Sequence, residues 1–199
     1  MENYNFFAMV NRMKRIDRWA LMQNTAKENI AEHSHCVAVL AHALATIGNQ
    51  YFGKAYNADR AAVLALYHDT TEVITGDMPT PVKYYNDDIK NVYKEIEQVA
   101  GARLLQMLPT ELQGVYTPFF ERQPQDEALW QLVKAADKLS ALIKCVEETR
   151  MGNREFEIAL QSQEKIIAEM ALPEVQYFSE YFLTPYYLTL DEHTRQSGA

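Results

Sequence analysis

Apolar residues recur every three or four positions along most of this chain, the spacing that gathers side chains on one face of an α-helix. The pattern predicts helices over residues 4–13, 29–48, 58–68, 89–104, 126–151 and 154–171, with a short one reaching Phe178. No segment alternates apolar and polar residues strongly enough to predict a sheet. We therefore expect an all-α fold. A chain of 199 residues, 48% of them hydrophobic, fits a single compact domain spanning 1–199.

Polar and helix-breaking residues set the expected ends of these helices. Asn29, with Glu32 three residues later, forms a loose capping box, and Gly48 is expected to stop the same helix. Pro118 and Pro124 are expected to lie in a connection that precedes the 126–151 helix.

Charge and cysteine content narrow the class of protein. The formal net charge of −8 and the isoelectric point near 5.2 argue against a broad basic surface for polymeric nucleic acid. A small anionic substrate is still compatible with this net charge, because a metal and one or two local cations can overcome the overall negative field of the protein.

Cys36 and Cys145 fall within helical patterns, so we expect them to be small buried hydrophobes in a protein of a reducing compartment. Residues 1–14 show no signal-peptide pattern and no apolar run approaches membrane-spanning length, so we expect a cytoplasmic protein without a membrane partner.

The stretch 58–83 carries the candidate chemistry, with His68 and Asp69 adjacent at the end of an apolar helix. An imidazole and a carboxylate are costly to bury unless something compensates both, which a divalent cation does. Glu72 is expected one helical turn beyond His68 on the same face, within reach of a water proton. The alternative is that His68 is a hydrogen-bonded core residue, and the pair alone does not decide between the two.

Further candidate ligands lie on inward faces of other helices. His33 falls one turn before Val37 in the core stripe, whereas His35 points away and His42 lies on the flank. Asp137 sits at the edge of the apolar ladder of 126–151, and a partly buried carboxylate requires a cation. The inward ionisable groups are thus His33, His68, Asp69 and Asp137. Such a nitrogen and oxygen set suits Mn, Co, Zn or Fe, with bonds of roughly 2.0–2.2 Å.

Two irregular segments adjoin this set. The segment 16–27 has no steady period and is expected to be a loop. In it, Arg18 and Trp19 are either a solvated charge and a core anchor, or a phosphate-binding guanidinium beside an aromatic wall. The segment 75–81 contains Gly76 and two prolines, which predicts a rigid loop of the kind that holds substrate beside a metal.

The order H…HD…D over helices, with E-H-S at 32–34, resembles the HD-domain metal-dependent phosphohydrolase superfamily. Four segments resemble more narrowly the bacterial 5′-deoxynucleotidase group: R-W at 18–19, A-E-H-S at 31–34, Y-H-D-T-T-E at 67–72 and T-G-D-M-P-T-P-V-K at 75–83. The match at the level of motifs spans 18–137, within an expected motif-bearing core of 18–151.

The resemblance implies a role for each matching residue. The implied ligands of one divalent cation, Co, Mn, Zn or similar, are His33, His68, Asp69 and Asp137. Glu72 is implied as the acid–base group and Arg18 as the residue that orients the phosphate. The implied substrate contacts are Arg18, Trp19, His33, Asp69, Asp77, Met78, Pro79, Thr80 and Asp137.

The activity implied is metal-dependent hydrolysis of deoxyribonucleoside 5′-monophosphates to deoxyribonucleoside and phosphate, by a homodimer. Two alternatives stay open. One is another HD phosphohydrolase, acting on a cyclic nucleotide, a dNTP or a guanosine polyphosphate. The other is a non-catalytic nucleotide-binding module that keeps the helices as a scaffold, against which the intact ligand set and Glu72 argue.

Overall fold

The structure, a computed structural model, describes residues 3–83 and 85–196, excluding the side chains of Thr80, Arg195 and Gln196. Within those ranges it contains helices, turns and irregular segments, with one isolated bridge between Asp17 and Asn29. The expected all-α fold is confirmed. The α-helices are α1 (Phe6–Val10), α2 (Ile30–Tyr51), α3 (Ala58–Tyr67), α4 (Glu72–Thr75), α5 (Thr80–Lys83), α6 (Asp87–Leu105), α7 (Thr110–Phe120), α8 (Glu127–Arg150), α9 (Glu157–Ala168), α10 (Pro173–Tyr181) and α11 (Leu190–Gln196). The short 3₁₀ helices are η1 (Asn11–Arg15), η2 (Pro124–Asp126), η3 (Arg154–Phe156) and η4 (Thr184–Tyr187).

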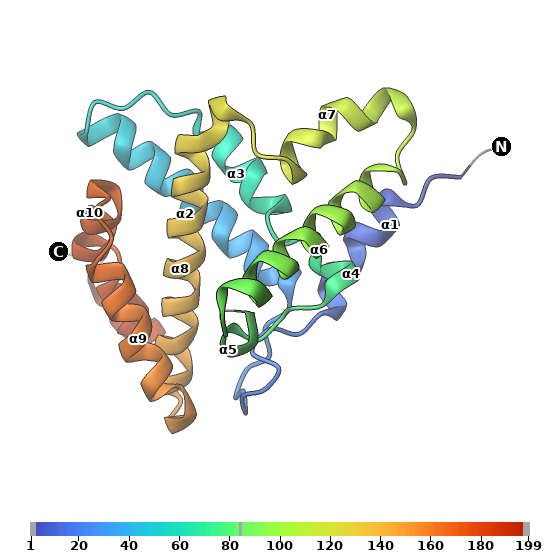
Figure 1. The fold of residues 1–199 in the computed structure, drawn as a ribbon. Coiled ribbons are helices and arrows are strands. Elements are labelled where there is room, and N and C mark those ends of the chain that lie inside the picture. The colour runs from blue at the N-terminus through green and yellow to red at the C-terminus, as the bar shows by residue number, and fades with distance from the viewer. Residues whose placement is uncertain (1–2, 84, 197–199) are drawn as a thin grey trace.

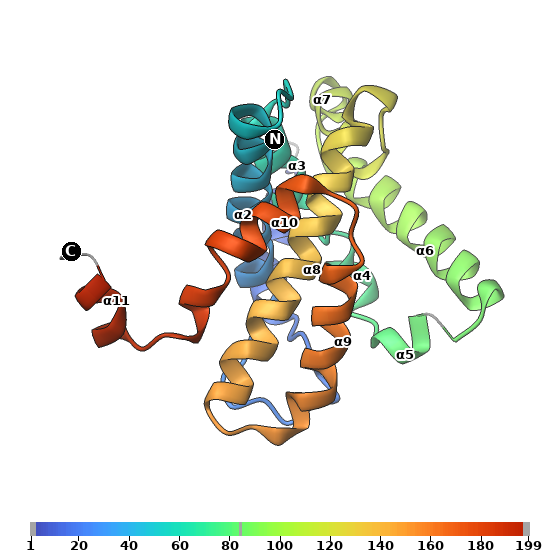
Figure 2. The same ribbon diagram turned by 90° about the vertical axis from the view of Figure 1, so that its left-hand side faces the viewer.

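Helices α2 and α8 form the centre of the molecule and pack against each other and against α3 (Figure 1). Helices α9 and α10 cover one side of this centre, while α1, α4, α6 and α7 lie on the other. Helix α11 at the C-terminal end stands away from the body (Figure 2). The central helices therefore connect distant parts of the sequence, which is how residues from α2, α3 and α8 can meet.

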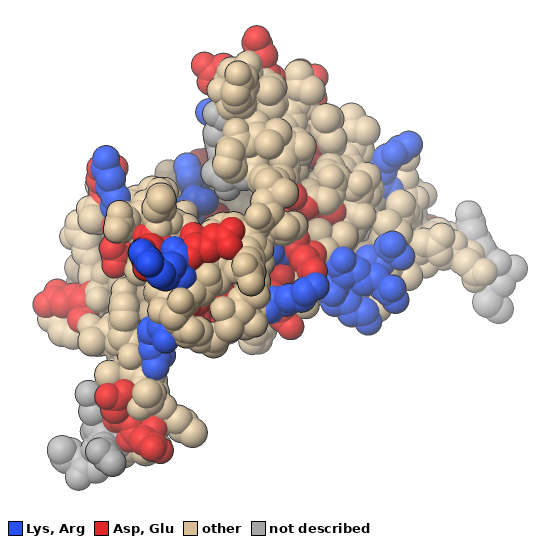
Figure 3. Space-filling model, turned by 90° about the horizontal axis from the view of Figure 1, so that it is seen from below, with Lys and Arg blue, Asp and Glu red and all other residues tan. Residues whose placement is uncertain are grey.

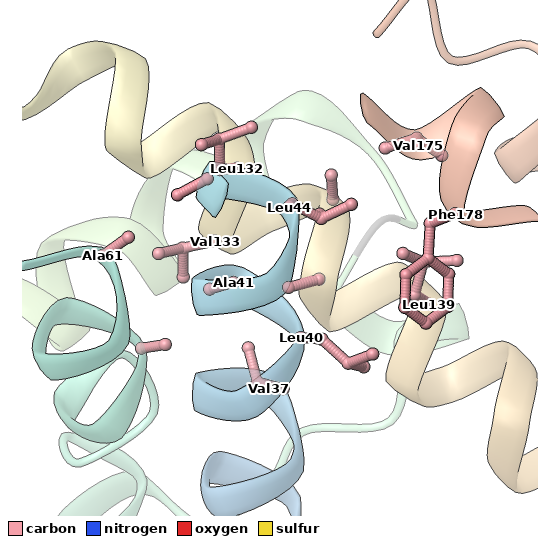
Figure 4. Close-up of a cluster of buried hydrophobic side chains, with 14 of the residues drawn as sticks. Val37, Leu40, Ala41, Leu44, Ala61, Leu132, Val133, Leu139, Val175 and Phe178 are labelled. Atoms are coloured by element: carbon pink, nitrogen blue, oxygen red, sulfur yellow. The ribbon is translucent and has the colours of Figure 1, made fainter. Parts of the chain in front are cut away.

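The core is built on the apolar stripe of α2. Val37, Ala41 and Leu44 are fully buried and face residues of α3, α8 and α10, among them Leu139 and Phe178 (Figure 4). Burying an aliphatic side chain of the size of Val or Leu stabilises the fold by about 1.5–3 kcal/mol. The stripe expected from sequence is thus the one that holds the central helices together.

Helix α2 is long and apolar enough to cross a membrane by length and composition alone, with 56% of the 18-residue window buried inside the protein. A buried core helix has the same length and composition, so these two properties alone do not indicate a membrane span. The central position of α2 explains its composition, because a helix that packs against α3, α8 and α10 is apolar on most of its circumference.

Local hydrogen bonds explain where α2 starts, but the local glycine signal does not explain where it ends. Asn29 Oδ1 accepts from the backbone N–H of Glu32, and Glu32 Oε2 accepts from that of Asn29, each at 3.1 Å, which completes the capping box. Gly48 does not stop the helix, which continues to Tyr51. A Cβ at Gly48 would lie 2.7 Å from Tyr56 Cε2 and 2.9 Å from Glu174 Oε1, so this glycine allows close packing instead.

The expected connection around Pro118 is also a helix. Pro118 lies inside α7, in its last turn, and its missing N–H removes one hydrogen bond of the helix. The aromatic residues of α7 pack on distant partners: Tyr116 contacts Phe6, and Phe119 stacks on Tyr67 with ring centroids 4.7 Å apart. Tertiary packing overrides the local proline signal here.

Two predictions of burial were wrong in part. Val92, Ile96 and Val99 belong to the apolar pattern that predicted the 89–104 helix, and a buried face was expected there. They are 47–60% exposed, because α6 lies at the edge of the body and packs through only part of its surface. Cys145 is buried, but Cys36 is exposed on α2.

Candidate active site

The four candidate ligands come together where α2, α3 and α8 meet. His33 Nε2 on α2 lies 3.1 Å from Asp137 Oδ1 on α8 and 3.6 Å from Asp69 Oδ2. His68, which caps the C-terminus of α3, places its Nε2 3.1 Å from Asp69 Oδ2. One ligand atom each of His33, His68 and Asp69 lies within 4.8 Å of the others. His35 and His42 are exposed and take no part.

Both histidines present an Nε2 that lacks a hydrogen-bond partner. His68 Nδ1 lies 2.7 Å from the carbonyl oxygen of Ala65, a bond it makes by donating its proton, so Nε2 keeps its lone pair. His33 is fully buried, and its Nδ1 lies 3.2 Å from Ser140 Oγ. Both Nε2 atoms are buried without a hydrogen bond. A buried polar atom without a partner is rare, and a cation between these nitrogens and carboxylates would satisfy them.

The carboxylates of the site are held ionised. Burial alone would raise the pKa of Asp69, but the neighbouring His68 outweighs it and lowers the pKa to about 2. Burial likewise opposes ionisation of Asp137, whose pKa is nevertheless held well below its usual value by His33 and Lys138. Since a carboxylate binds metal in its deprotonated form, both groups suit the role of ligand.

Glu72 does not lie on the same helix as His68, as had been expected. Helix α3 ends at Tyr67, and a turn separates it from α4, which starts at Glu72 itself. The side chain is still buried, and its Oε2 has no hydrogen-bond partner. Burial, with the negative charges of Asp69 and Asp77, raises the pKa of Glu72 to about 10. The group therefore carries a proton at neutral pH and can donate it.

Arg18 lies beside the candidate ligands, and it and Trp19 are both held by a residue that the sequence did not point to. Arg18 Nη1 is 2.7 Å from His33 Nδ1 and donates to Glu28 Oε2, also at 2.7 Å. Trp19 Nε1 donates to the same Glu28 oxygen at 3.1 Å. Arg18 Nη2 lies 4.0 Å from Asp137 Oδ1. The guanidinium is therefore not the solvated charge of the simpler interpretation.

Glu28 escaped prediction because its role depends on a pairing across the loop. The backbone N–H of Arg18 donates to the carbonyl of Glu28 at 2.9 Å, and that of Ile30 to Ile16 at 3.0 Å. This short antiparallel contact sets Glu28 opposite Arg18. The available signal was only the opposite charge of two residues at the two ends of a predicted loop.

The segment after α4 supplies the remaining candidates. Gly76 adopts φ 74°, a left-handed conformation that glycine accepts readily, and Asp77, Met78 and Pro79 follow, each partly exposed. Burial raises the pKa of Asp77, while the charge of Arg18 opposes the rise. The side chain of Thr80 lies outside the described residues.

A family model for YfbR-like 5′-deoxynucleotidases matches residues 5–186. The chain belongs to this family. It is 49% identical over 192 residues to a 5′-deoxynucleotidase of Vibrio vulnificus, covering 96% of this chain and 99% of that one. It is 45% identical over 197 residues to the 5′-deoxynucleotidase YfbR of Escherichia coli, covering 99% of each chain. The resemblance drawn from the four sequence segments is confirmed.

Solved structures agree on the fold of this nucleotidase family member. An HD-domain phosphohydrolase from Listeria innocua superposes with a TM-score of 0.81 at 21% identity, covering 96% of this chain and 92% of that one. A cyanophage S-2L HD phosphohydrolase, described as bound to dA and one catalytic Zn²⁺ ion, superposes with a TM-score of 0.58 at 21% identity, covering 96% of both chains. The HD-type helical fold is therefore confirmed.

Proposed function

We propose that the protein hydrolyses deoxyribonucleoside 5′-monophosphates to deoxyribonucleoside and phosphate in a metal-dependent reaction. One observation carries this proposal: two buried Nε2 atoms without hydrogen bonds, on His33 and His68, face the ionised Asp69 and Asp137. The guanidinium of Arg18 lies directly beside them. Family membership supports the choice of substrate.

His33, His68, Asp69 and Asp137 would hold one divalent cation, with Co, Mn and Zn as candidates. Such an ion, when bound, polarises a phosphoryl oxygen and lowers the pKa of water from ~16 toward ~7. Described histidines beyond these two lie away from the site or on the surface, which favours a single ion over two.

The residues around the ligands bind the substrate and handle its protons. Arg18 neutralises the negative charge of the phosphoryl group with a planar pair of donors that Lys lacks. As water attacks phosphorus and the bond to the 5′ oxygen breaks, Glu72 gives the proton held on its carboxyl group to the leaving oxygen and recovers one from the attacking water. Asp77 accepts from the 3′-hydroxyl, while Trp19, with Met78, Pro79 and Thr80, surrounds the nucleoside.

The setting proposed for this activity is a cytoplasmic homodimer that binds neither polymeric nucleic acid nor membranes. The net charge of −8 supports the first exclusion, and on the face in Figure 3 Lys and Arg groups stand beside Asp and Glu groups. Two free cysteines suit a reducing compartment.

A substrate screen tests the function. Purified protein is supplied with deoxy- and ribonucleoside monophosphates in parallel, each with Co²⁺, Mn²⁺, Zn²⁺ or Mg²⁺, and phosphate release is measured. The proposal predicts release from the deoxynucleotides that a chelator abolishes. Turnover of a cyclic nucleotide or of a dNTP, without turnover of monophosphates, would instead favour another HD phosphohydrolase, and binding without turnover would favour the module.

A further inference from the structure

A buried ion pair lies near the C-terminal end of α8, outside the ligand set. Lys144 and Glu148 are one helical turn apart, and their side chains are 6% and 1% exposed. Burying two charges costs more than their attraction returns unless other hydrogen bonds satisfy the remaining donors and acceptors. The other hydrogen-bond partners of Lys144 and Glu148 therefore indicate the role of the ion pair.

Those partners belong to the loop that carries Arg18 and Trp19. Glu148 Oε2 accepts from the backbone N–H of Thr25 at 2.8 Å, and Glu148 Oε1 accepts from that of Ala26 at 3.1 Å. Lys144 Nζ donates to Glu148 and to the carbonyl oxygen of Ala26. Lys144 and Glu148 thus both form hydrogen bonds with the loop backbone at residues 25–26.

Asn153, just after α8, extends this attachment. Its Nδ2 atom donates to Glu148 Oε2 and to the carbonyl oxygen of Gln23, each at 2.7 Å. The backbone N–H of Gln23 in turn donates to Glu155 Oε2 at 3.1 Å. The loop is therefore attached at residues 23, 25 and 26 to the end of α8, the turn that follows and η3.

The loop needs such attachment, because Trp19 has φ 56°. A bulky residue avoids this left-handed region and stays there only when its surroundings leave no alternative. The carbonyl oxygen of Trp19 accepts from the backbone N–H of Met22 at 2.9 Å and from Asn24 Nδ2 at 3.1 Å, and its ring centroid lies 5.4 Å from that of Phe156. The turn that fixes Trp19 thus runs directly into the segment bonded by Glu148.

We propose that Glu148, with Lys144 and Asn153, is a positioning residue that holds the 19–26 loop so that Trp19 and Arg18 face the ligand set. It acts through backbone N–H groups and does not touch substrate. The effect on turnover rests on the proposed function, whereas the effect on the position of Trp19 does not.

The test compares Glu148→Gln with a matched control, Asp126→Asn. Glutamine keeps the shape of the side chain but removes the charge that faces Lys144 and turns an NH₂ group toward backbone donors. Asp126 is also a buried carboxylate in an ion pair, with Arg60 of α3 at 2.8 Å, so its loss weakens the fold in a comparable way. A purely structural role predicts the same behaviour for both variants once stability is matched.

The chain has two tryptophans, so a Trp130→Phe background leaves Trp19 as the only one. In that background we expect Glu148→Gln to shift Trp19 emission to longer wavelength and to increase its quenching by acrylamide, while Asp126→Asn changes neither. In otherwise unaltered protein, we expect Glu148→Gln to raise KM for dAMP by roughly tenfold or more, because misplaced binding groups lose their alignment. Bound metal, measured by elemental analysis, should stay at the parent level.

Asn153→Ala, which removes the bonds to Gln23 and Glu148 near the surface, gives the same comparison if Glu148→Gln does not fold. Unchanged Trp19 quenching and unchanged KM in the folded variant would overturn the proposal. A shift in quenching in a protein that hydrolyses no deoxynucleotide would support the positioning role and reject the proposed function.

Discussion

The Oε2 atom of Glu28 lies 2.7 Å from Nη1 of Arg18, so the guanidinium is held by a carboxylate of its own chain. The same oxygen accepts from Trp19 Nε1. Glu28 therefore fixes two neighbouring side chains that the proposed reaction uses for different purposes, one for the phosphoryl charge and one for the sugar.

Two substitutions of Glu28 should distinguish its effect on Arg18 from its effect on Trp19. Glu28→Gln keeps an acceptor for Trp19 but loses the charge-assisted bond to Arg18, so we expect kcat/KM to fall with little change in the deoxy-to-ribo ratio. Glu28→Ala loses both bonds, and a fall of roughly 10–100-fold with weakened selectivity is expected. Steady-state kinetics on dAMP and AMP measures both; identical behaviour of the two variants would mean that the bond to Trp19 has no effect on selectivity.

Glu72→Ala should separate chemistry from binding. The buried carboxyl, with its pKa raised to about 10, holds a proton at neutral pH and begins α4, just after the turn that carries the candidate ligands His68 and Asp69. We expect the variant to keep its metal and bind nucleotide, but to lose ~10²–10⁴-fold in turnover. Activity within a small factor of the parent would show that Glu72 has no role in proton transfer.

Sugar selectivity should depend on Trp19 and not on Asp77. A deoxy substrate offers no additional group to bind, so a pocket rejects ribose only by crowding the 2′-hydroxyl or burying it without a partner. We expect Trp19→Ala to relax selectivity toward ribonucleotides and Asp77→Ala to weaken both substrates together. Matched kinetics on deoxy and ribo monophosphates checks this, and a Trp19→Ala enzyme with the parent's preference would contradict it.

The stability contributed by Glu148 should depend on pH in a defined direction. Burial would raise its pKa, but hydrogen bonds from Lys144, Asn153 and the loop backbone lower it from 4.5 to about 2. The folded state therefore gains stability from ionised Glu148 above about pH 4.5, and this gain is lost as the pH falls toward 2. We expect the difference in free energy of unfolding between parent and Glu148→Gln, from urea titration, to be larger at pH 7 than at pH 3. An equal difference at both would show that the pKa of Glu148 is not lowered on folding.

Local patterns in the sequence predicted those parts of the fold that local chemistry decides. The α2 stripe through Val37 and the capping box at Asn29 needed only helical periodicity and a polar start. Gly48 and Pro118 were misread because packing against distant residues overrides a local signal for a helix end or a connection. The candidate ligand His33 could be placed inward by the same periodicity that placed the core.

Residues whose roles depend on long-range pairing leave weaker signals in the sequence. Glu28 is separated by 10 positions from Arg18, and Glu148 by 123 from Thr25. Within the apolar pattern of α8, Lys144 and Glu148 resemble an ordinary exposed pair, one turn apart. Only the folded chain shows that they are buried and that the loop covers them.

We propose that hydrolysis of a deoxynucleoside monophosphate needs one divalent cation, held by His33, His68, Asp69 and Asp137. The most direct test adds a divalent metal stepwise to chelator-stripped protein while phosphate release from dAMP is followed, in the parent and in Asp137→Ala. We predict that the parent regains full activity at one equivalent of metal. Asp137→Ala should keep its helical circular dichroism but retain no metal by elemental analysis. Activity in the stripped parent, or unchanged metal stoichiometry in Asp137→Ala, would contradict the account.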